Sequence, residues 1–461
     1  MTFKSETAER QVSVVDAADY NLDAQASAML SALCSRSQEG PKGNLAKVMA
    51  EGPERFMKSI YLGYGHESVG KQGHTKVFVS GVSMIAINEL QNLNPLYKGT
   101  EASTRYIPFE AEGVYLPETM ERFRPLIEET MSVYEIIQPM VFDHLKATLT
   151  KPEGVSDKKW DATLNARKFD ICRSLLPAGC KTVGVWDVDL QNASYVLRVL
   201  WGHPNEEVRL MARDMHASLC ERYPESFTSL TDDIAMWASM QHRANHQMMP
   251  SAAVPPTHRD AIGQVHMDSR LLDSVGIQQW ARHLAERPKY APLADYLGNF
   301  GRLKFNYNVD FGGYRDLNRH RKGNTSRSPL GTQIGFEPWY LEQMPEEARS
   351  IVEALLDKIH KTYMDLTVHG WGDNEHWDWE YIIPMGYRVA TETSYPIDNA
   401  VYTAELRSGP TVHPTVRRIA QDMLNKMETL NLGFKLHGYR DEIDKLDVRR
   451  ADQTICLKED K

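Results

Sequence analysis

The spacing of apolar residues along the chain predicts helices that alternate with a few strands. In residues 44–62 apolar side chains recur at helical intervals, whereas residues 75–82 alternate between apolar and polar side chains, as a strand with one buried face does. The helical period returns in residues 83–93, and the alanine-rich first thirty-five residues also favour helix. The pattern therefore predicts a mixed fold of helices and strands.

Two longer helical patterns begin alike, at Tyr115 and at Tyr340. Each starts with a Tyr-Leu pair, and proline and acidic residues follow close behind, as a helix N-terminus favours. The apolar positions that then recur at helical spacing are Phe123, Leu126, Ile127, Met131 and Tyr134 in the first pattern and Ile351, Leu355, Ile359 and Tyr363 in the second. This likeness suggests that the chain repeats itself.

A closer repeat joins two stretches that lie about two hundred residues apart. Each has an apolar-Pro-x-Gly turn, then Asn-Ala and a tyrosine, and later Val-Arg and Asp-Met pairs. These positions are Leu176, Pro177, Gly179, Asn192, Ala193, Tyr195, Val208, Arg209, Asp214 and Met215 in the first stretch, and Ile383, Pro384, Gly386, Asn399, Ala400, Tyr402, Val416, Arg417, Asp422 and Met423 in the second. Residues 78–90 and 305–317 also match without a gap. Self-similarity on this scale predicts a duplicated domain rather than a short-period solenoid.

The duplication leads to a prediction of the fold. We expect an α/β fold of the α+β type with two repeated lobes, each a mainly antiparallel sheet flanked by helices. The chain has 461 residues, more than one ordinary hydrophobic core supports. We place the first lobe at residues 1–230, the junction at residues 231–289, where the pattern is weakest, and a second, shorter lobe at residues 290–461.

Composition and charge restrict the function without identifying it. Hydrophobic residues make up 42% and charged residues 25% of the chain, which are ordinary globular values. A net charge of −9 argues against a broad surface for nucleic acid or an anionic membrane, and no apolar run is as long as a membrane span. The opening residues lack the apolar core of a secretory signal. Five cysteines without a Cys-x-x-Cys pair indicate reduced thiols. We therefore expect a cytoplasmic protein without a bound metal.

The loop Glu101-Ala102-Ser103-Thr104-Arg105-Tyr106 carries groups that can wrap a phosphate. A serine hydroxyl, an arginine two residues later and free backbone N–H groups suit that task. Taken alone, the six residues are weak evidence, because serine and arginine are common in loops.

Other segments carry chemistry that is equally ambiguous when each is taken alone. Arg319-His320-Arg321 would suit a polyanion, and Gly65-His66-Glu67-Ser68 is a glycine-hinged turn that presents an imidazole. Arg173 and Arg407 flank the repeated motifs, although most such arginines are surface salt-bridge partners. Cys180 lacks a neighbouring base and is expected to be a packed thiol.

Taken in order, these segments resemble the flavin-dependent thymidylate synthases, which methylate dUMP without an active-site cysteine. A typical member has a His-Glu-(Ser/Thr) turn, a strand, a helix ending in Arg-His-Arg, a Glu-x-Ser-x-Arg-Tyr loop, an Arg-x-x-Leu-Pro segment, and a Trp-x-Val-Asn segment followed by a late arginine. The first half supplies Gly65–Ser68, Glu101–Tyr106, Arg173–Pro177 and Trp186–Asp189 in that order, within about residues 44 to 225. The resemblance implies a duplicated form, with the second copy over about residues 290 to 430.

The two copies depart from the family in different places. The first half has Asn92-Leu93-Asn94 where the family has Arg-His-Arg, whereas the second half keeps Arg319-His320-Arg321. Conversely, Glu380 stands where the first copy has Arg173. The family's late arginine aligns with Arg407, in the second half. The family motifs that one half lacks are therefore largely present in the other half. This distribution is expected if one site is divided between the two halves.

The resemblance implies a role for each matched residue. Catalytic roles fall on Arg173, Ser103 and Glu101. Substrate-binding roles fall on Glu89, Glu101, Ser103, Thr104, Arg105, Arg173 and Arg407. Cofactor-binding roles fall on His66, Ser68, Asp189, Arg319, His320 and Arg321. At Glu89 and Asp189 an acid replaces the glutamine and the asparagine that the family has.

The implied function is the reductive methylation of dUMP by an FAD-dependent enzyme, with methylene-tetrahydrofolate as the carbon donor and NADPH as a co-substrate. Sites of this family lie between the subunits of a homotetramer, so two tandem chains would form a homodimer that acts as a pseudo-tetramer. Two alternatives stay open. A related flavin enzyme could install another group on a pyrimidine nucleotide, which the acids at Glu89 and Asp189 would suit. A non-catalytic nucleotide-binding or scaffold protein could have kept the fold alone.

Overall fold

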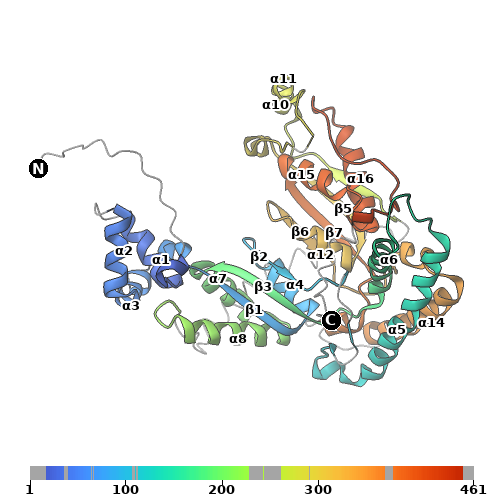
Figure 1. Cartoon of the computed structure of the whole chain (residues 1–461), viewed down its shortest axis with the longest axis horizontal. Coiled ribbons are helices and arrows are strands. Elements are labelled where there is room, and N and C mark those ends of the chain that lie inside the picture. The colour runs from blue at the N-terminus through green and yellow to red at the C-terminus, as the bar shows by residue number, and fades with distance from the viewer. Residues whose placement is uncertain are drawn as a thin grey trace, which may run out of the picture.

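The computed structural model describes residues 17–35, 40–63, 65, 67–105, 109–110, 113–227, 242, 261–289, 291–368 and 377–449. Within these residues the chain forms two antiparallel sheets with helices packed around them (Figure 1). The first sheet has the strand order β1-β3-β2 and the second the order β4-β5-β7-β6. The predicted α+β fold with antiparallel sheets is confirmed.

The first half of the chain supplies the three strands of the first sheet. These are β1 (His74–Ser83), β2 (Lys98–Glu101) and β3 (Lys181–Asp189). Its helical segments are η1 (Ala17–Tyr20), α1 (Ala24–Cys34), α2 (Gly40–Glu51), α3 (Glu54–Phe56), the π-helix η2 (Met57–Gly63), η3 (Glu67–Gln72), α4 (Met84–Asn92), η5 (Glu118–Phe123), α5 (Arg124–Thr148), α6 (Asp157–Cys172), η6 (Arg173–Leu175), α7 (Leu190–Trp201) and α8 (Glu206–Arg222). The single helix predicted over residues 44–62 is thus divided, because Gly52 has a φ of 70° and Pro53 follows it.

The second sheet is built from β4 (Val265–Asp268), β5 (Arg302–Asp310), β6 (Asn324–Arg327) and β7 (Arg388–Pro396). The accompanying helices are α10 (Ser274–Gln278), α11 (Ala281–Leu284), η7 (Asp295–Phe300), α12 (Phe311–Leu317), α13 (Pro338–Glu342), α14 (Glu346–Val368), η8 (Asp378–Ile382), α15 (Ile397–Arg407) and α16 (Pro414–Glu428). Because β4 lies within residues 231–289, the second sheet begins inside the range assigned to the junction.

The order of elements around the two sheets corresponds. In each half a long strand (β1 or β5) leads directly into a helix and then into a four-residue edge strand (β2 or β6). A long helix and a 3₁₀ turn follow, and the central strand (β3 or β7) leads into two further helices. This correspondence is what a duplication predicts, and the common origin itself stays a prediction.

One β-bulge breaks the correspondence between β1 and β5. In β1 the pairing with β3 shifts between Ser80 and Val82, and Gly81 there has a φ of 76°, which glycine adopts without strain. Because Gly81 is an extra residue in β1, the position in the first sheet that corresponds to Phe305 of β5 is Val77 and not Phe78. The gapless match of residues 78–90 with 305–317 therefore holds only after the bulge.

The two halves meet at their Pro-x-Gly turns. Pro177 and Pro384 form an antiparallel bridge. Around it the backbone hydrogen bonds come in matched pairs: Ala178 N–H donates to Ile383 O and Met385 N–H to Leu176 O, both at 2.9 Å. Equivalent residues thus exchange equivalent bonds, which is the pattern of a contact across a two-fold axis.

A continuous hydrophobic core joins the halves on one side of this contact. Residues of α5 and α6 pack into the same buried cluster as β5, β7, α14 and α16. A second cluster lies between the first sheet and helices α4, α7 and α8. The Pro-x-Gly contact and the shared core hold the loop after β2 close to the ends of α12 and α15.

Candidate functional site

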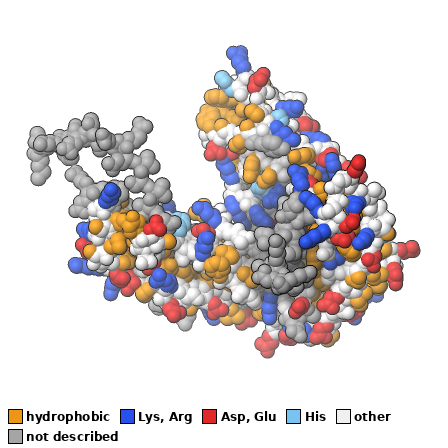
Figure 2. Space-filling model, viewed as in Figure 1, with side chains coloured by type: hydrophobic (Ala, Val, Ile, Leu, Met, Phe, Trp, Pro, Cys, Tyr) orange, Lys and Arg blue, Asp and Glu red, His pale blue; other side chains and the backbone are white. Residues whose placement is uncertain are grey.

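Predicted site residues from both halves come together between the two sheets. Glu101 ends β2, and Arg173 begins the short η6 turn after α6. Arg319 follows α12, and Arg407 ends α15, both in the second half. Figure 2 shows Lys and Arg side chains in the hollow where the part that carries β1 and β2 meets the part that carries α15 and α16.

Glu101 connects the first half to the helix that precedes the Arg-His-Arg motif. Its Oε2 accepts a hydrogen bond of 2.7 Å from Nη2 of Arg315, and its Oε1 accepts one of 3.2 Å from Nη2 of Arg319. Arg315 and Glu101 are both buried, whereas the side chain of Arg319 is 49% exposed. Glu101 is therefore held by two arginines, and part of Arg319 still faces solvent.

Asp316 lies at the centre of the arginine cluster. Burial alone would raise the pKa of this carboxyl, but Arg319, Arg173, Arg105 and Arg407 together lower it to about 2. Nη1 of Arg319 lies 3.8 Å from its Oδ1. The charges of four arginines from both halves therefore act on one carboxylate and favour its ionised form.

The loop after β2 is held by a helix of its own half. Nε of Arg105 donates to Oδ1 of the buried Asp170 at 2.8 Å, and Nη2 lies 3.4 Å from the carbonyl oxygen of Thr411. Ser103 Oγ accepts from the backbone N–H of Arg105 at 3.3 Å, and Thr104 is buried. The loop is thus a tight turn whose arginine reaches toward the second half.

Arg173 is buried and has hydrogen-bond donors to spare. Its side chain is 3% exposed, and its Nε and Nη2 have no hydrogen-bond partner among the described residues. A Cβ on Gly312 would lie 3.1 Å from both Arg173 Nη2 and Asp310 Oδ2, so glycine lets these two side chains approach the backbone closely. A buried guanidinium with free N–H groups is costly unless a ligand satisfies them. This arrangement suits an anion.

Arg407 and His320 are hydrogen-bonded, which orients Arg407 and sets the protonation state of His320. Nε of Arg407 donates to Nε2 of His320 at 2.8 Å, and its Nη2 donates to the carbonyl oxygen of Asp316 at 2.9 Å. The imidazole nitrogen that accepts this bond must be unprotonated. Burial and the charge of Arg407 lower the pKa of His320 to about 3. His320 is therefore neutral and serves to orient Arg407.

Arg321 turns to the opposite side of its motif. Its Nη1 donates to the carbonyl oxygen of Gln91 at 2.8 Å, and its guanidinium lies 5.4 Å from the ring centroid of Tyr97. Its buried Nε and Nη2 have no hydrogen-bond partner among the described residues. Arg321 thus also has free donors, beside the turn Pro95–Tyr97.

The remaining cofactor-binding candidates belong to a different place. A cavity of about 890 Å³ is lined by Tyr61, Leu62, Gly65, Lys71, Pro95, Leu96, Asp189, Gln191, Asn192, Ser194, Tyr195, Arg198 and Ser226. Asp189 caps α7 by accepting from the N–H of Asn192 at 2.8 Å. Ser68 is exposed in η3, and His66 lies outside the described residues. No described contact joins Asp189 or Ser68 to the arginine cluster.

Glu89 lies in a buried cluster of its own, at the place in the first half that Asp316 holds in the second. Its carboxylate is 3.6 Å from Nε2 of His203 and 3.6 Å from Nη2 of Arg327. Burial opposes ionisation, but His203 and Arg327 lower the pKa of Glu89. Arg327 also forms a bidentate pair with Glu380, at 2.6 and 3.2 Å. Glu89 is therefore part of a closed ion cluster, separate from Ser103, Arg105 and Arg173.

Three residues of the site were not anticipated from the sequence: Asp170, Arg315 and Asp316. Asp170 precedes Arg173 by three residues, and Asp316 precedes Arg319 by three, a spacing that places side chains on one face of a helix. That spacing was a usable signal. Arg315 had no signal of its own, because its partner Glu101 is 214 residues away.

Other candidates in the sequence play structural roles. Cys180 is fully buried, and burial raises the pKa of its thiol far above the usual range, as expected for a packed thiol. Among the helices that the structure describes, none is long and apolar enough to span a membrane.

Comparison with known proteins relates the first half of the chain to a known family. Residues 14–225 match the family model described as thymidylate synthase complementing protein. A UPF0159 protein of Thermoplasma acidophilum is 21% identical, with 82% of this chain and 87% of the relative covered. UPF0159 proteins of Chlamydia pneumoniae and Chlamydia muridarum are 24% and 22% identical, over 87% and 82% of this chain and 83% and 79% of their own lengths.

These alignments cover more of the chain than the family model does, so the relatives share part of the second half as well. No solved structure matches the chain significantly. The family match covers the half that carries the loop after β2, Arg173 and Asp189. Residues 14–225, a little under half of the chain, are therefore similar to the thymidylate synthase complementing proteins, which confirms the resemblance to the flavin-dependent thymidylate synthases.

Proposed function

We propose that the chain is a flavin-dependent enzyme that methylates dUMP, with FAD as cofactor and methylene-tetrahydrofolate and NADPH as co-substrates. The observation that carries this proposal is the meeting of Arg105 and Arg173, from the matched half, with Arg319 and Arg407, from the other half, around Asp316. Arginines are always charged and bind phosphate through paired N–H groups. Asp316, Asp170 and Glu101 offset part of their charge, and an anion bound between the halves would use the donors that stay free on Arg173.

The nucleotide phosphate fits best beside Arg173. Its Nε and Nη2, which have no hydrogen-bond partner among the described residues, provide donors on the buried side. Arg319 provides a charge from the solvent side. Arg105 and the hydroxyl of Ser103 lie on the loop that would close over the phosphate. Arg407, held by the neutral His320, would approach from the second half and hold the nucleotide in place.

A flavin fits the remaining free donors. Arg321 has two unpartnered N–H groups, and the turn Pro95–Tyr97 that it contacts also borders the cavity of about 890 Å³. Tyr61 and Tyr195 give that cavity aromatic sides, and Lys71 gives it a cation. The bound flavin would supply the electrons of the reaction. The chain's part is to bind, orient and exclude water, because in such enzymes the hard chemistry belongs to the cofactor.

We further propose one nucleotide site per chain and a homodimer as the working unit. The place equivalent to Arg173 in the second half holds Glu380, which is already paired with Arg327. That counterpart has no free cation to offer a phosphate. Asp189 and Ser68 lie apart from the arginine cluster of their own chain, so a second chain would bring its own set to the site. Size-exclusion chromatography with light scattering tests the dimer.

The decisive experiment measures flavin and nucleotide together on the purified chain. We expect a flavin absorption band and binding of dUMP by calorimetry, and methylation of dUMP when both co-substrates are present. Arg173→Met should weaken dUMP binding, whereas Arg270→Ala, which removes an exposed arginine that pairs with Asp268, should not. A colourless chain that does not bind dUMP after incubation with FAD would contradict the proposal and favour a scaffold role.

A second candidate function is supported by one specific feature. Asp316 is an ionised carboxylate inside the proposed nucleotide site. A carboxylate accepts hydrogen bonds and favours a ring that carries an amino group over one that carries a carbonyl. We therefore also propose a related flavin enzyme that acts on an amino-bearing pyrimidine nucleotide. Tighter binding of dCMP than of dUMP in the same calorimetric experiment would favour this candidate.

A further inference from the structure

The two sheets differ by one strand. β1 is an edge strand of the first sheet, whereas β5, at the same place in the second sheet, has β4 paired along its outer side. An unpaired edge presents a row of backbone N–H and C=O groups that natural proteins usually cover. Among the residues that the structure describes, the outer side of β1 therefore has no paired strand such as β4 provides for β5.

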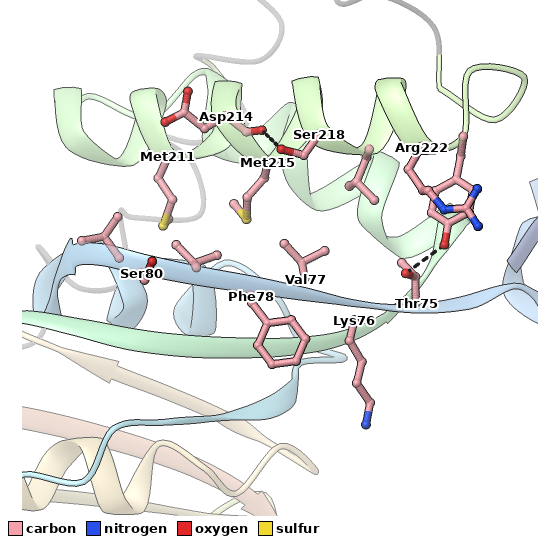
Figure 3. A pocket seen from close by; sticks show the side chains of 14 residues that line it. Thr75, Lys76, Val77, Phe78, Ser80, Met211, Asp214, Met215, Ser218 and Arg222 are labelled. Atoms are coloured by element: carbon pink, nitrogen blue, oxygen red, sulfur yellow. Dashed lines mark hydrogen bonds between the residues drawn. The ribbon is translucent and has the colours of Figure 1, made fainter. Parts of the chain in front are cut away.

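A groove of about 370 Å³ follows this open edge, between β1 and α8 (Figure 3). Figure 3 shows Met211 and Met215 of α8 and Val77 of β1 pointing into the space between the two elements, whereas Phe78 points away from α8. Asp214 lines the same groove. The groove thus has an apolar floor, a free strand edge and one carboxylate.

In the second half the corresponding space is filled by β4. Val265, the first residue of β4, is buried between β5 and α16, and its backbone N–H donates to Oδ2 of Asp422 at 2.7 Å. Asp422 and Asp214 hold the same position in the repeated motif. The groove in the first half has therefore kept the acceptor that, in the second half, caps the start of a docked strand.

A short stretch near residue 11 resembles the start of β4. The residue before β4 and its first three residues read Gln264-Val265-His266-Met267, and Gln11-Val12-Ser13-Val14 shares the Gln-Val pair and an apolar fourth residue. β4 precedes α10, η7 and β5 in the chain, and residues 11–15 likewise precede α1, η3 and β1. Residues 11–15 lie outside the part of the chain that the structure describes. Their sequence and their place before α1, η3 and β1 correspond to those of β4 before α10, η7 and β5.

We propose that residues 11–15 dock in this groove as an extended segment antiparallel to β1. In the second sheet Val265 pairs with Tyr307. Tyr307 corresponds to Val79 of the first sheet, because Tyr307 lies opposite the fourth residue of β7 and Val79 lies opposite the fourth residue of β3. Val12 therefore lies opposite Val79, and its N–H donates to Asp214. Val12 and Val14 face Met211 and Met215, and Ser13 lies on the outer face opposite Phe78. The first sheet then has four strands, as the second does, and this inference is independent of the proposed enzymatic function.

Cysteine cross-linking of the full chain tests both the register and the occupant. Ser13→Cys combined with Phe78→Cys should form a disulfide within one chain under mild oxidation, identified by mass spectrometry of the unreduced digest. The control pair is Ser5→Cys with Phe78→Cys, which changes a residue outside the docked segment. If both pairs cross-link equally or not at all, the proposal is overturned. A disulfide between two chains also overturns it, because the occupant is then a second copy.

Hydrogen exchange gives a second readout that does not depend on cysteine chemistry. Val12→Asp with Val14→Asp would place two charges on the apolar floor, and the amides of residues 76–80 should then exchange at least about tenfold faster. The matched control, Thr2→Asp with Thr7→Asp, adds the same charge outside the segment and should leave that exchange unchanged. Equal exchange in the two variants would show that nothing from residues 11–15 covers β1.

Discussion

The same two positions carry opposite charges in the two halves of the molecule. Glu101 and Arg327 each end a short edge strand, opposite the fourth residue of the central strand. Arg173 and Glu380 each precede the proline of the Pro-x-Gly turn by four residues. In the second half Arg327 and Glu380 neutralise each other. In the first half Glu101 is bound by Arg315 instead, and Arg173 keeps free donors.

This comparison shows how a duplicated site can be closed without losing the fold. A carboxylate in place of an arginine supplies, from inside the chain, the negative charge that a ligand phosphate would bring. The pair is buried on both sides and bidentate, so it holds the edge strand in place permanently. The second half can then lose its ligand-binding residues and keep its fold, while the first half keeps residues that can bind a ligand.

Breaking the buried ion pair between Arg327 and Glu380 should destabilise the fold more than the other substitutions. Arg327→Met leaves the buried carboxylate of Glu380 unpaired, which costs about 3–5 kcal/mol in comparable cases. Arg327→Met with Glu380→Met removes both charges of the pair and should cost less than Arg327→Met alone, because Glu380 is no longer left unpaired and Glu89 keeps His203 as a partner. Urea denaturation measures both. Equal losses in the single and double variants would mean that the pair does not act as a unit.

Replacing Arg173, which has free donors, should affect ligand binding and not the stability of the fold. Arg173→Met deletes the free donors, so dUMP affinity should fall by about 1.5–3 kcal/mol, the usual range for hydrogen bonds to charged groups. Glu380→Gln changes the charge at the equivalent position of the other half and should leave dUMP affinity nearly unchanged. Calorimetry on folded variants decides. Equal losses of affinity in the two variants would show that both halves contribute to one site or that both sites are open.

The two versions of the Arg-His-Arg motif give the next test. Arg319→Ala with Arg321→Ala removes two cations that can offset a pyrophosphate, so the purified protein should contain little flavin but remain folded. Asn92→Ala with Asn94→Ala changes the corresponding uncharged positions, and flavin content should be nearly that of the unmodified chain. Absorbance per chain measures both. The reverse outcome would assign flavin binding to the first half.

The sequence predicted which residues would meet better than it predicted what holds them. The antiparallel sheets and the strand and helix around Ser83 follow from local patterns, since periodicity and capping act over a few residues. The duplication stays a prediction. The family match then placed Arg173 and the loop after β2 in one half. The division of 44–62 at Gly52 and the bulge at Gly81 were missed, because a single glycine gives no periodic signal.

The closed cluster could not be predicted for a different reason. Glu89 was assigned to the substrate because its position in the family motif was known, but its neighbours were not. His203 and Arg327 lie more than one hundred residues away from it in sequence. Only the packing of the two halves brings these three groups together, and that packing decides whether an arginine is free or neutralised. Charge partners across a domain contact are not encoded in any local pattern.

A smaller effect is expected when the acid inside the open site is neutralised. Asp316 competes with a ligand for Arg105, Arg173, Arg319 and Arg407. Asp316→Asn keeps the shape and removes one negative charge, so dUMP or inorganic phosphate should bind about three- to tenfold more tightly, which corresponds to about 0.7–1.4 kcal/mol. Weaker binding would show that Asp316 positions the arginines and does not compete for them.

The smallest expected effect concerns pH. Burial and Arg407 hold the pKa of His320 at about 3, and the arginines hold that of Asp316 at about 2. A group with a lowered pKa is deprotonated at all higher pH, so neither residue should titrate between about pH 5.5 and 8.5, although an unperturbed histidine would. Sulfate keeps its charge throughout this range and is therefore the suitable probe. Its affinity should change by less than about twofold. A clear rise in sulfate affinity below about pH 6.5 would mean that His320 becomes protonated, which is incompatible with the hydrogen bond that its Nε2 accepts from Arg407.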